Sequence, residues 1–151
     1  MKDIRIQLQN PTDRGRLYPR YDAEADLLEV TSAVPGEWSY GVDIDGAIIF
    51  DLDADQILTN VDVLISKRYW EVIVPVTVPQ ATREASIRFL EDTIRHKSFN
   101  IPVVVQTDPL RSHTYILLGG PEKIGTWIAL SNRCLALVKE DCLKGFFIIL
   151  Q

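Results

Sequence analysis

The chain has 151 residues, of which 46% are hydrophobic and 25% are charged, and its formal net charge is −5. This length suits one domain that buries its own core without help from a disulfide or a metal. The opening residues, MKDIRIQLQN, alternate charged and apolar side chains, which excludes a signal peptide. Apolar runs of about five residues are too short to cross a bilayer, which takes roughly 20. We therefore expect a soluble, cytoplasmic protein that has no cofactor and does not bind membranes.

Short segments with alternating apolar and polar residues, separated by turn residues, follow one another along most of the chain. This spacing predicts antiparallel strands joined as a meander. The expected strands span residues 4–9, 25–34, 38–44, 47–52, 57–65, 72–79, 103–106, 113–119, 125–130, 134–138 and 146–150. Of these, Pro75 and Pro79 make 72–79 either an edge strand or a connector. A slip in the alternation at Thr59-Asn60 indicates a β-bulge in the fifth of these strands.

One segment, at about residues 81–97, follows a helical pattern instead. Ile87, Leu90 and Ile94 recur on one stripe, and Phe89 lies on the flank of that stripe. Two oppositely charged pairs at helical spacing support this helix, Glu84 with Arg88 and Glu91 with Arg95. The predicted fold class is therefore α+β, with mostly antiparallel β-meander sheets and one main helix packed across a sheet.

Charge is distributed unevenly along this single domain of residues 1–151. Between Tyr21 and Ser66 there are eleven acids and no Lys or Arg, whereas the other residues hold ten acids and sixteen bases. We therefore divide the domain into an acidic β-meander part, residues 1–66, and a strand–helix–strands part, residues 67–151. A block of negative charge argues against nucleic acid as a partner and favours a basic protein.

The acidic stretch DLDADQ, residues 51–56, follows an apolar run and has three possible interpretations. Haloacid-dehalogenase phosphatases continue Asp-x-Asp with glycine, but Ala54 stands there and no Lys or Arg is near to neutralise a phosphate. A calcium-binding EF-hand would place its glycine where Gln56 stands, and it needs a helix on each side. A turn between two strands, formed by Asp side chains that accept hydrogen bonds from their own backbone, explains the stretch best.

Two segments carry a resemblance. YDAEADLLEV, residues 21–30, and DLDADQILTNVDVL, residues 51–64, are similar to the two halves of a short bacterial family, a domain of unknown function that begins Y-D-x-E-A-D-x-L-Y-I. The resemblance covers residues 17–66, and two family glycines are replaced here by Gln56 and Asn60. It implies a small β-meander whose turns are shaped by Asp22, Asp26, Asp51 and Asp53. It implies no activity, and residues 67–151 resemble no family known to us.

Other groups that could carry chemistry are few. Cys134 and Cys142 lie in an apolar region, and we expect reduced, buried thiols there. His113 stands beside Ser112 and near Asp108, where a surface turn is expected instead of a catalytic triad. No arrangement of residues indicates an enzyme, and we expect none.

The favoured hypothesis is a protein-binding protein with an acidic face. A bacterial toxin-immunity protein, which inhibits a basic toxin domain, fits the size, the charge and the lack of catalytic groups. The residues expected to bind the partner are Asp43, Asp45, Asp51, Asp53, Asp55, Trp38 and Tyr40. Two alternatives stay open. One is a self-associating domain that forms a homodimer through its sheet edges. The other is a metal-assisted hydrolase built on Asp43, Asp45, Asp51 and Asp53.

Overall fold

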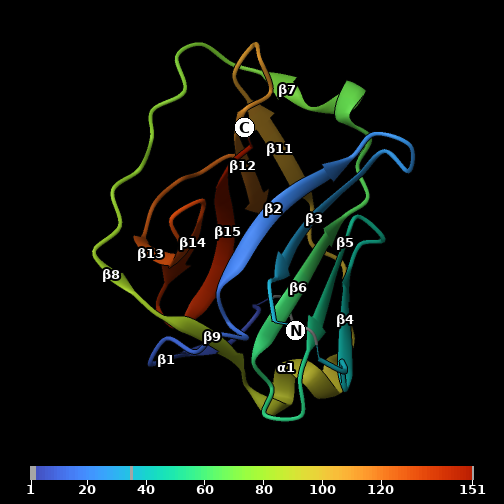
Figure 1. The fold of residues 1–151 in the computed structure, drawn as a ribbon, viewed down its shortest axis with the longest axis vertical. Helices are drawn as coiled ribbons and strands as arrows, with labels where there is room; N and C mark the ends of the chain where they lie inside the picture. Colours follow the sequence, from blue (N-terminus) through green and yellow to red (C-terminus); the bar gives the residue numbers. More distant parts are fainter. Residues whose placement is uncertain (1–2, 35, 151) are drawn as a thin grey trace.

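The computed structural model describes residues 3–34 and 36–150, which form two β-sheets packed face to face (Figure 1). The front sheet has the strand order β10 (Ser98–Phe99), β4 (Tyr40–Ile44), β5 (Ile48–Leu52), β6 (Leu58–Val63), β3 (Leu27–Ser32) and β2 (Leu17–Asp22). The back sheet has the order β7 (Glu71–Val72), β11 (Val103–Thr107), β12 (His113–Leu118), β15 (Cys142–Ile149), β14 (Cys134–Lys139), β13 (Thr126–Ser131) and β8 (Arg83–Glu84). Strands make up 51% of the described residues and helical segments 6%, so the fold is an all-β sandwich.

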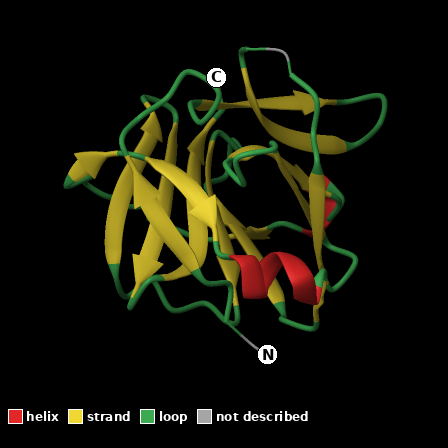
Figure 2. Ribbon diagram, turned by 90° about the horizontal axis from the view of Figure 1, so that it is seen from below, coloured by secondary structure: helices red, strands yellow, loops and turns green. Residues whose placement is uncertain are grey.

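A two-stranded ribbon, β1 (Ile6–Gln9) paired with β9 (Ser86–Phe89), closes one end of the sandwich. Its backbone is paired with both sheets. Arg5 forms an isolated antiparallel β-bridge with Cys142 of the back sheet, and Arg88 forms another with Ile57 beside the front sheet. The short helix α1 (Glu91–His96) follows the ribbon and lies against β4. In the view from below, this helix is drawn in red among the yellow strands (Figure 2). The single-turn 3₁₀ helix η1 (Lys67–Tyr69) lies near the opposite end.

The core lies between the two sheets and follows from the alternation of the strands. In β5, for example, Ile48, Phe50 and Leu52 are buried, while Ile49 and Asp51 point outward. Phe50 makes an edge-to-face contact with Phe89 of the ribbon, with ring centroids 5.2 Å apart. Phe50 and Phe89 belong to one hydrophobic cluster, which contains residues from both predicted parts of the chain, 1–66 and 67–151.

The predicted bulge at Thr59-Asn60 is present. Asp51 of β5 pairs with Asn60 and Leu52 pairs with Leu58, so the register skips Thr59. The extra residue lets Leu58 and Val61 both point into the core although they are three positions apart.

The predicted α+β class and its helix at residues 81–97 are wrong. Helix α1 has six residues, and the segment before it forms β8 and β9. Ile87 and Phe89 are buried at a spacing of two, whereas Leu90, which the helical stripe would bury, is only half-buried. Pairing of β9 with β1 provides hydrogen-bond partners for the facing backbone groups of both strands, and the strand alternation places these two side chains in the core. Long-range pairing therefore outweighs a local pattern that is compatible with a helix.

Of the two charged pairs that supported the predicted helix, both within the described residues, one forms within α1 and the other does not form. Glu91 and Arg95 lie within α1 and form an ion pair at 3.8 Å. Glu84 instead approaches Arg16 at 3.2 Å, because it belongs to a strand.

The back sheet also has an apolar outer face, formed by Tyr115, Leu117, Leu137 and Phe147. The segment from residue 73 to 82 leads from β7 at one edge of the sheet to β8 at the other, and Figure 1 shows it as an arc outside the strands. Val76 packs on the cluster, and the hydroxyl of Tyr115 donates a hydrogen bond to the carbonyl of Thr77. For the segment 72–79, predicted as an edge strand or a connector, only Val72 belongs to the edge strand β7, and the remainder is a connector. Pro75 and Pro79 offer no N–H to a neighbouring strand.

Among the described residues, no helix combines the length and the apolar character that a membrane span requires.

Candidate binding face

The outer surface of the front sheet carries four of the eleven acids between Tyr21 and Ser66 in two rows that cross the strands. Every second residue of a strand points away from the core, and the strand register aligns these outward residues. One row reads Asp43, Ile49, Asp62, Glu29 and Arg20, from β4 to β2. The neighbouring row reads Gly41, Asp51, Asn60, Thr31 and Tyr18. We call this surface the acidic face.

Asp51 occupies the centre of the acidic face and is half-buried. The side-chain amide of Asn60 donates one hydrogen bond to Asp51 at 3.1 Å and another to Asp62 at 3.0 Å, so one amide bridges two carboxylates. Burial raises the pKa of Asp51, the charge of Asp62 raises it further, and the bond from Asn60 partly offsets both effects. Among the described residues, no cation lies within ion-pair distance of either carboxylate.

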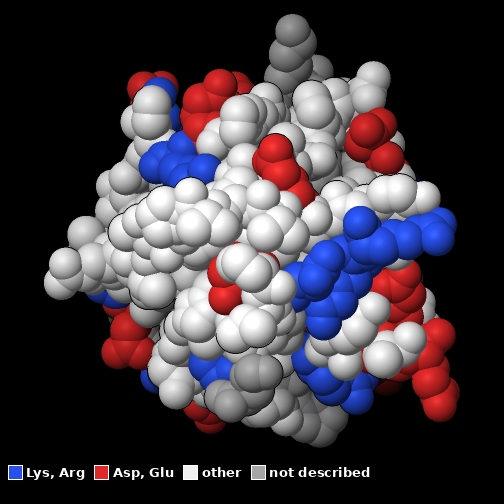
Figure 3. Space-filling view, turned by 90° about the horizontal axis from the view of Figure 1, so that it is seen from above, with Lys and Arg blue, Asp and Glu red and all other residues white. Residues whose placement is uncertain are grey.

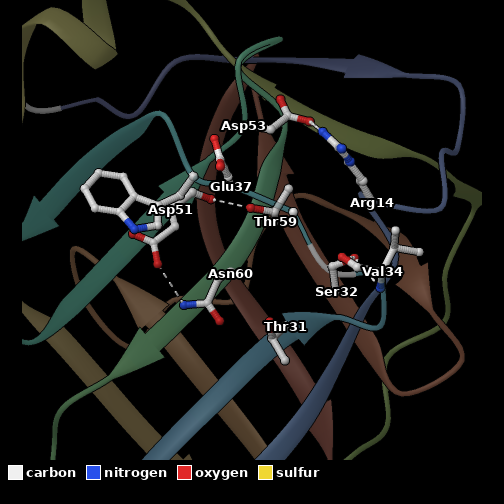
Figure 4. A pocket seen from close by; sticks show the side chains of 11 residues that line it. Arg14, Thr31, Ser32, Val34, Glu37, Asp51, Asp53, Thr59 and Asn60 are labelled. Atoms are coloured by element: carbon white, nitrogen blue, oxygen red, sulfur yellow. Dashed lines mark hydrogen bonds and ion pairs between the residues drawn. The ribbon is translucent and has the colours of Figure 1, made fainter.

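A cavity of about 170 Å³ opens beside Asp51 (Figure 4). Its walls include Glu37 and Trp38, which precede β4, together with Thr59 and Asn60 of β6. Trp38 is 65% exposed, so a large amphipathic side chain is available to a partner next to the carboxylates. Tyr40, at the start of β4, is 38% exposed.

Asp53 is placed differently from the other predicted site residues. It is buried, and its Oδ1 accepts the N–H groups of Asp55 at 2.9 Å and Ile57 at 3.0 Å. These bonds make Asp53 the organiser of the β5–β6 turn, the role that an Asp in a turn usually has. Arg14, from outside the acidic block, faces its Oδ2 at 3.8 Å on the cavity wall, so part of the negative charge here is neutralised (Figure 4).

The predicted partner-binding aspartates are therefore brought together only in part. Asp43 and Asp51 share the acidic face, although Asp43 also accepts the N–H of Gly46 at 3.2 Å. Asp45 lies in the β4–β5 turn, and Asp53 and Asp55 lie in the β5–β6 turn. The two turns stand at opposite ends of β5, which is about 13 Å long at 3.3 Å per residue.

This separation also bears on the metal-assisted alternative. Asp43, Asp45, Asp51 and Asp53 do not converge, and no three His, Cys, Asp or Glu side chains of the described chain gather in a way that could hold a metal ion. The stretch DLDADQ has β5 on one side and β6 on the other, so the two helices of an EF-hand are not formed there.

The sequence analysis did not predict three residues of the acidic face as partner-binding residues, namely Asp62, Glu29 and Asn60. Their outward direction follows from the alternation in β3 and β6, so a signal was present. Their alignment with Asp43 and Asp51 depends on the register of four strands, and the bulge at Thr59 shifts that register.

The Ser112, His113 and Asp108 side chains do meet, in the turn between β11 and β12. The hydroxyl of Ser112 donates to Asp108 at 2.8 Å and lies 2.9 Å from Nδ1 of His113. Burial alone would raise the pKa of Asp108, but the N–H of His113 and both donors of Ser112 outweigh it and lower that pKa. Nδ1 of His113 faces both Ser112 and Asp108, whereas a catalytic relay uses the two ring nitrogens for different partners. The three side chains stabilise the turn.

No protein-family profile and no curated protein sequence matches this chain. The resemblance of residues 17–66 to a domain of unknown function therefore stays a prediction.

Proposed function

We propose that this chain is a non-enzymatic binding protein whose acidic face receives a basic protein partner. The observation that carries the proposal is the charge at Asp51 and Asp62, which share one amide and have no cation within ion-pair distance among the described residues. A half-buried carboxylate beside a second carboxylate is costly when left alone. A Lys or Arg from a partner would lower that cost.

The exposed indole of Trp38 gives such a partner an apolar anchor at the rim of the acidic face. Aromatic residues beside charged groups that become buried on association are typical binding hot spots. An immunity protein that inhibits a basic bacterial toxin in the cytoplasm is the specific form of this function that we favour.

The homodimer alternative receives less support from the sheet edges. Within the described residues, the front and back sheets have four edge strands: β7, β8 and β10 have two residues each, and β2 contains Pro19. Short edges and a proline both reduce the backbone groups that another strand could pair with.

The test uses the full chain as bait in an extract of its native cells. The charge-neutralised variant carries Asp43→Asn, Asp51→Asn and Asp62→Asn. A control variant carries Glu122→Gln, Glu140→Gln and Asp141→Asn, three exposed acids outside the acidic face that change the net charge equally. We expect the wild type and the control to capture the same basic protein and the neutralised variant to lose it.

Kinetics with that captured protein then separate binding from folding. Neutralising the acidic face should slow association by tens-fold or more at low salt and flatten the salt dependence, because long-range attraction accelerates encounter. The thermal melting temperature should stay equal or rise, since the removed charges repel one another. Capture of the same proteins at the same rate by the neutralised variant would refute the proposed function.

A further inference from the structure

Three basic side chains converge at the end of the sandwich opposite α1. Lys67 and Arg68 come from η1, and Arg111 comes from the β11–β12 turn. Together with Tyr21 and Ser66 they line a cavity of about 630 Å³ that is open to solvent. Viewed from this end, the surface shows Lys and Arg side chains gathered into a band (Figure 3). We call this cavity the basic pocket.

The floor of the basic pocket is held by Asp26. Its carboxylate accepts hydrogen bonds from the hydroxyls of Ser66 and Tyr21 (2.6 Å for Tyr21) and from the N–H of Lys67 at 3.1 Å. The bond from Ser66, then those from Tyr21 and Lys67, lower the pKa of Asp26 to about 2, so this group is charged at neutral pH. These bonds join the β2–β3 hairpin to η1.

Aromatic rings orient the charged groups of Lys67 and Arg68, but no carboxylate forms an ion pair with them within the described residues. Nζ of Lys67 stands 4.2 Å from the centre of the Tyr21 ring, and the guanidinium of Arg68 stands 4.8 Å from the centre of the Tyr69 ring. Within the described part of the chain, none of Lys67, Arg68 and Arg111 makes an ion pair. Three positive charges against the single charge of Asp26 leave the lining of the pocket with a net charge of about +2.

We propose that the basic pocket binds a phosphoryl group that carries two negative charges. A phosphate monoester is largely a dianion at neutral pH, which matches the charge of the lining. Two arginines offer planar forks of N–H donors that suit phosphate oxygens, and Lys67 adds a point charge. This site is separate from the acidic face and does not depend on the function proposed for that face.

The rim of the basic pocket indicates that the phosphoryl group is part of a larger molecule. Leu110, next to Arg111, is 85% exposed, and Tyr69, next to Arg68, is 67% exposed. Large apolar side chains at such exposure are available to the remainder of the ligand. A soluble phosphate ester and the headgroup of a phospholipid share this chemistry.

The first measurement is an NMR titration of the labelled full chain with inorganic phosphate, against sodium chloride at equal ionic strength. Shifts confined to residues 66–68 and 110–111 are expected. Sedimentation with phosphatidylcholine vesicles, with and without phosphatidic acid, identifies the source of the phosphoryl group. Binding to phosphate and to the phosphatidic acid vesicles indicates a lipid headgroup, and binding to phosphate alone indicates a soluble ester. Absence of both would overturn the proposal.

Variants test which residues carry the binding. Arg68→Gln and Arg111→Gln should each weaken phosphate binding about tenfold, the effect of losing a charged hydrogen bond. Arg95→Gln is the matched control, because Arg95 is an exposed arginine on α1 at the other end of the molecule. Equal binding by all three variants, with unchanged thermal melts, would contradict the assignment. The variant neutralised at the acidic face should bind phosphate as the wild type does, which keeps this test separate from that of the proposed function.

Discussion

Substitution of Phe89 by alanine tests the central structural claim, that residues 83–89 pair as strands and insert side chains between the sheets. Phe89 is fully buried, and its ring contacts Phe50 with centroids 5.2 Å apart. Its N–H donates to the carbonyl of Gln56 at 2.9 Å, which fixes the backbone on which the ring is mounted. Because the surrounding sheets can close only partly around the lost ring, Phe89→Ala should lower the free energy of unfolding by about 3–5 kcal/mol.

Leu90→Ala is the informative comparison. In the strand arrangement Leu90 is half-buried, so its truncation should cost about 1 kcal/mol. In a helix over residues 81–97, Leu90 would lie on the buried stripe and Phe89 on its flank, and the order of the two losses would reverse.

Urea unfolding of both variants, followed by tryptophan fluorescence and far-ultraviolet circular dichroism, measures the two losses. A domain of this size has a stability of about 5–15 kcal/mol, so a loss of about 3–5 kcal/mol is a large fraction of the total and is easily distinguished from a loss of about 1 kcal/mol. A loss for Leu90→Ala equal to or above that for Phe89→Ala would refute the reasoning. A spectrum dominated by helix would do the same.

Three further predictions concern other parts of the molecule. The pKa of Asp26 is about 2 in the folded state, below its value of roughly 3.9 in the unfolded state. Its contribution to stability should therefore be present above about pH 4 and be lost as the pH falls toward 2. In urea titrations, the difference in free energy of unfolding between wild type and Asp26→Asn should narrow from about pH 5 to pH 2. Cys134 and Cys142 stand at opposite ends of the β14–β15 hairpin, so alkylation under non-reducing, denaturing conditions should modify both thiols, and an unmodified pair would contradict the structure. Gly145→Ala should destabilise the protein by about 2–4 kcal/mol, because a Cβ would lie 2.4 Å from the carbonyl oxygen of Ile116 and the residue has a φ of +155°. Gly46→Ala should cost only about 1–2 kcal/mol, because the space around Gly46 is open. Thermal melts of both variants measure the two losses.

The sequence alone determined most of the strands and the chemistry of one turn. Alternation in β5 predicts which side chains enter the core, because a strand sends successive residues to opposite faces. The slip at Thr59-Asn60 predicts the bulge, since one inserted residue shifts a period of two by a single position and leaves the strand otherwise intact. The role of Asp53 in the β5–β6 turn is equally local, because its partners lie within four residues along the chain.

Tertiary structure decided the fate of residues 81–90. Their apolar positions fit a helical stripe and a strand equally well, and only the presence of β1 as a pairing partner, about 80 residues earlier in the chain, selects the strand. The acidic face and the basic pocket have the same origin. Asp62 shares a face with Asp43 and Asp51 only through strand register. Arg111 lines the same pocket as Lys67 only because the β11–β12 turn and η1 meet at one end of the sandwich. Local sequence dictates the direction of each side chain, but pairing between distant segments dictates its neighbours.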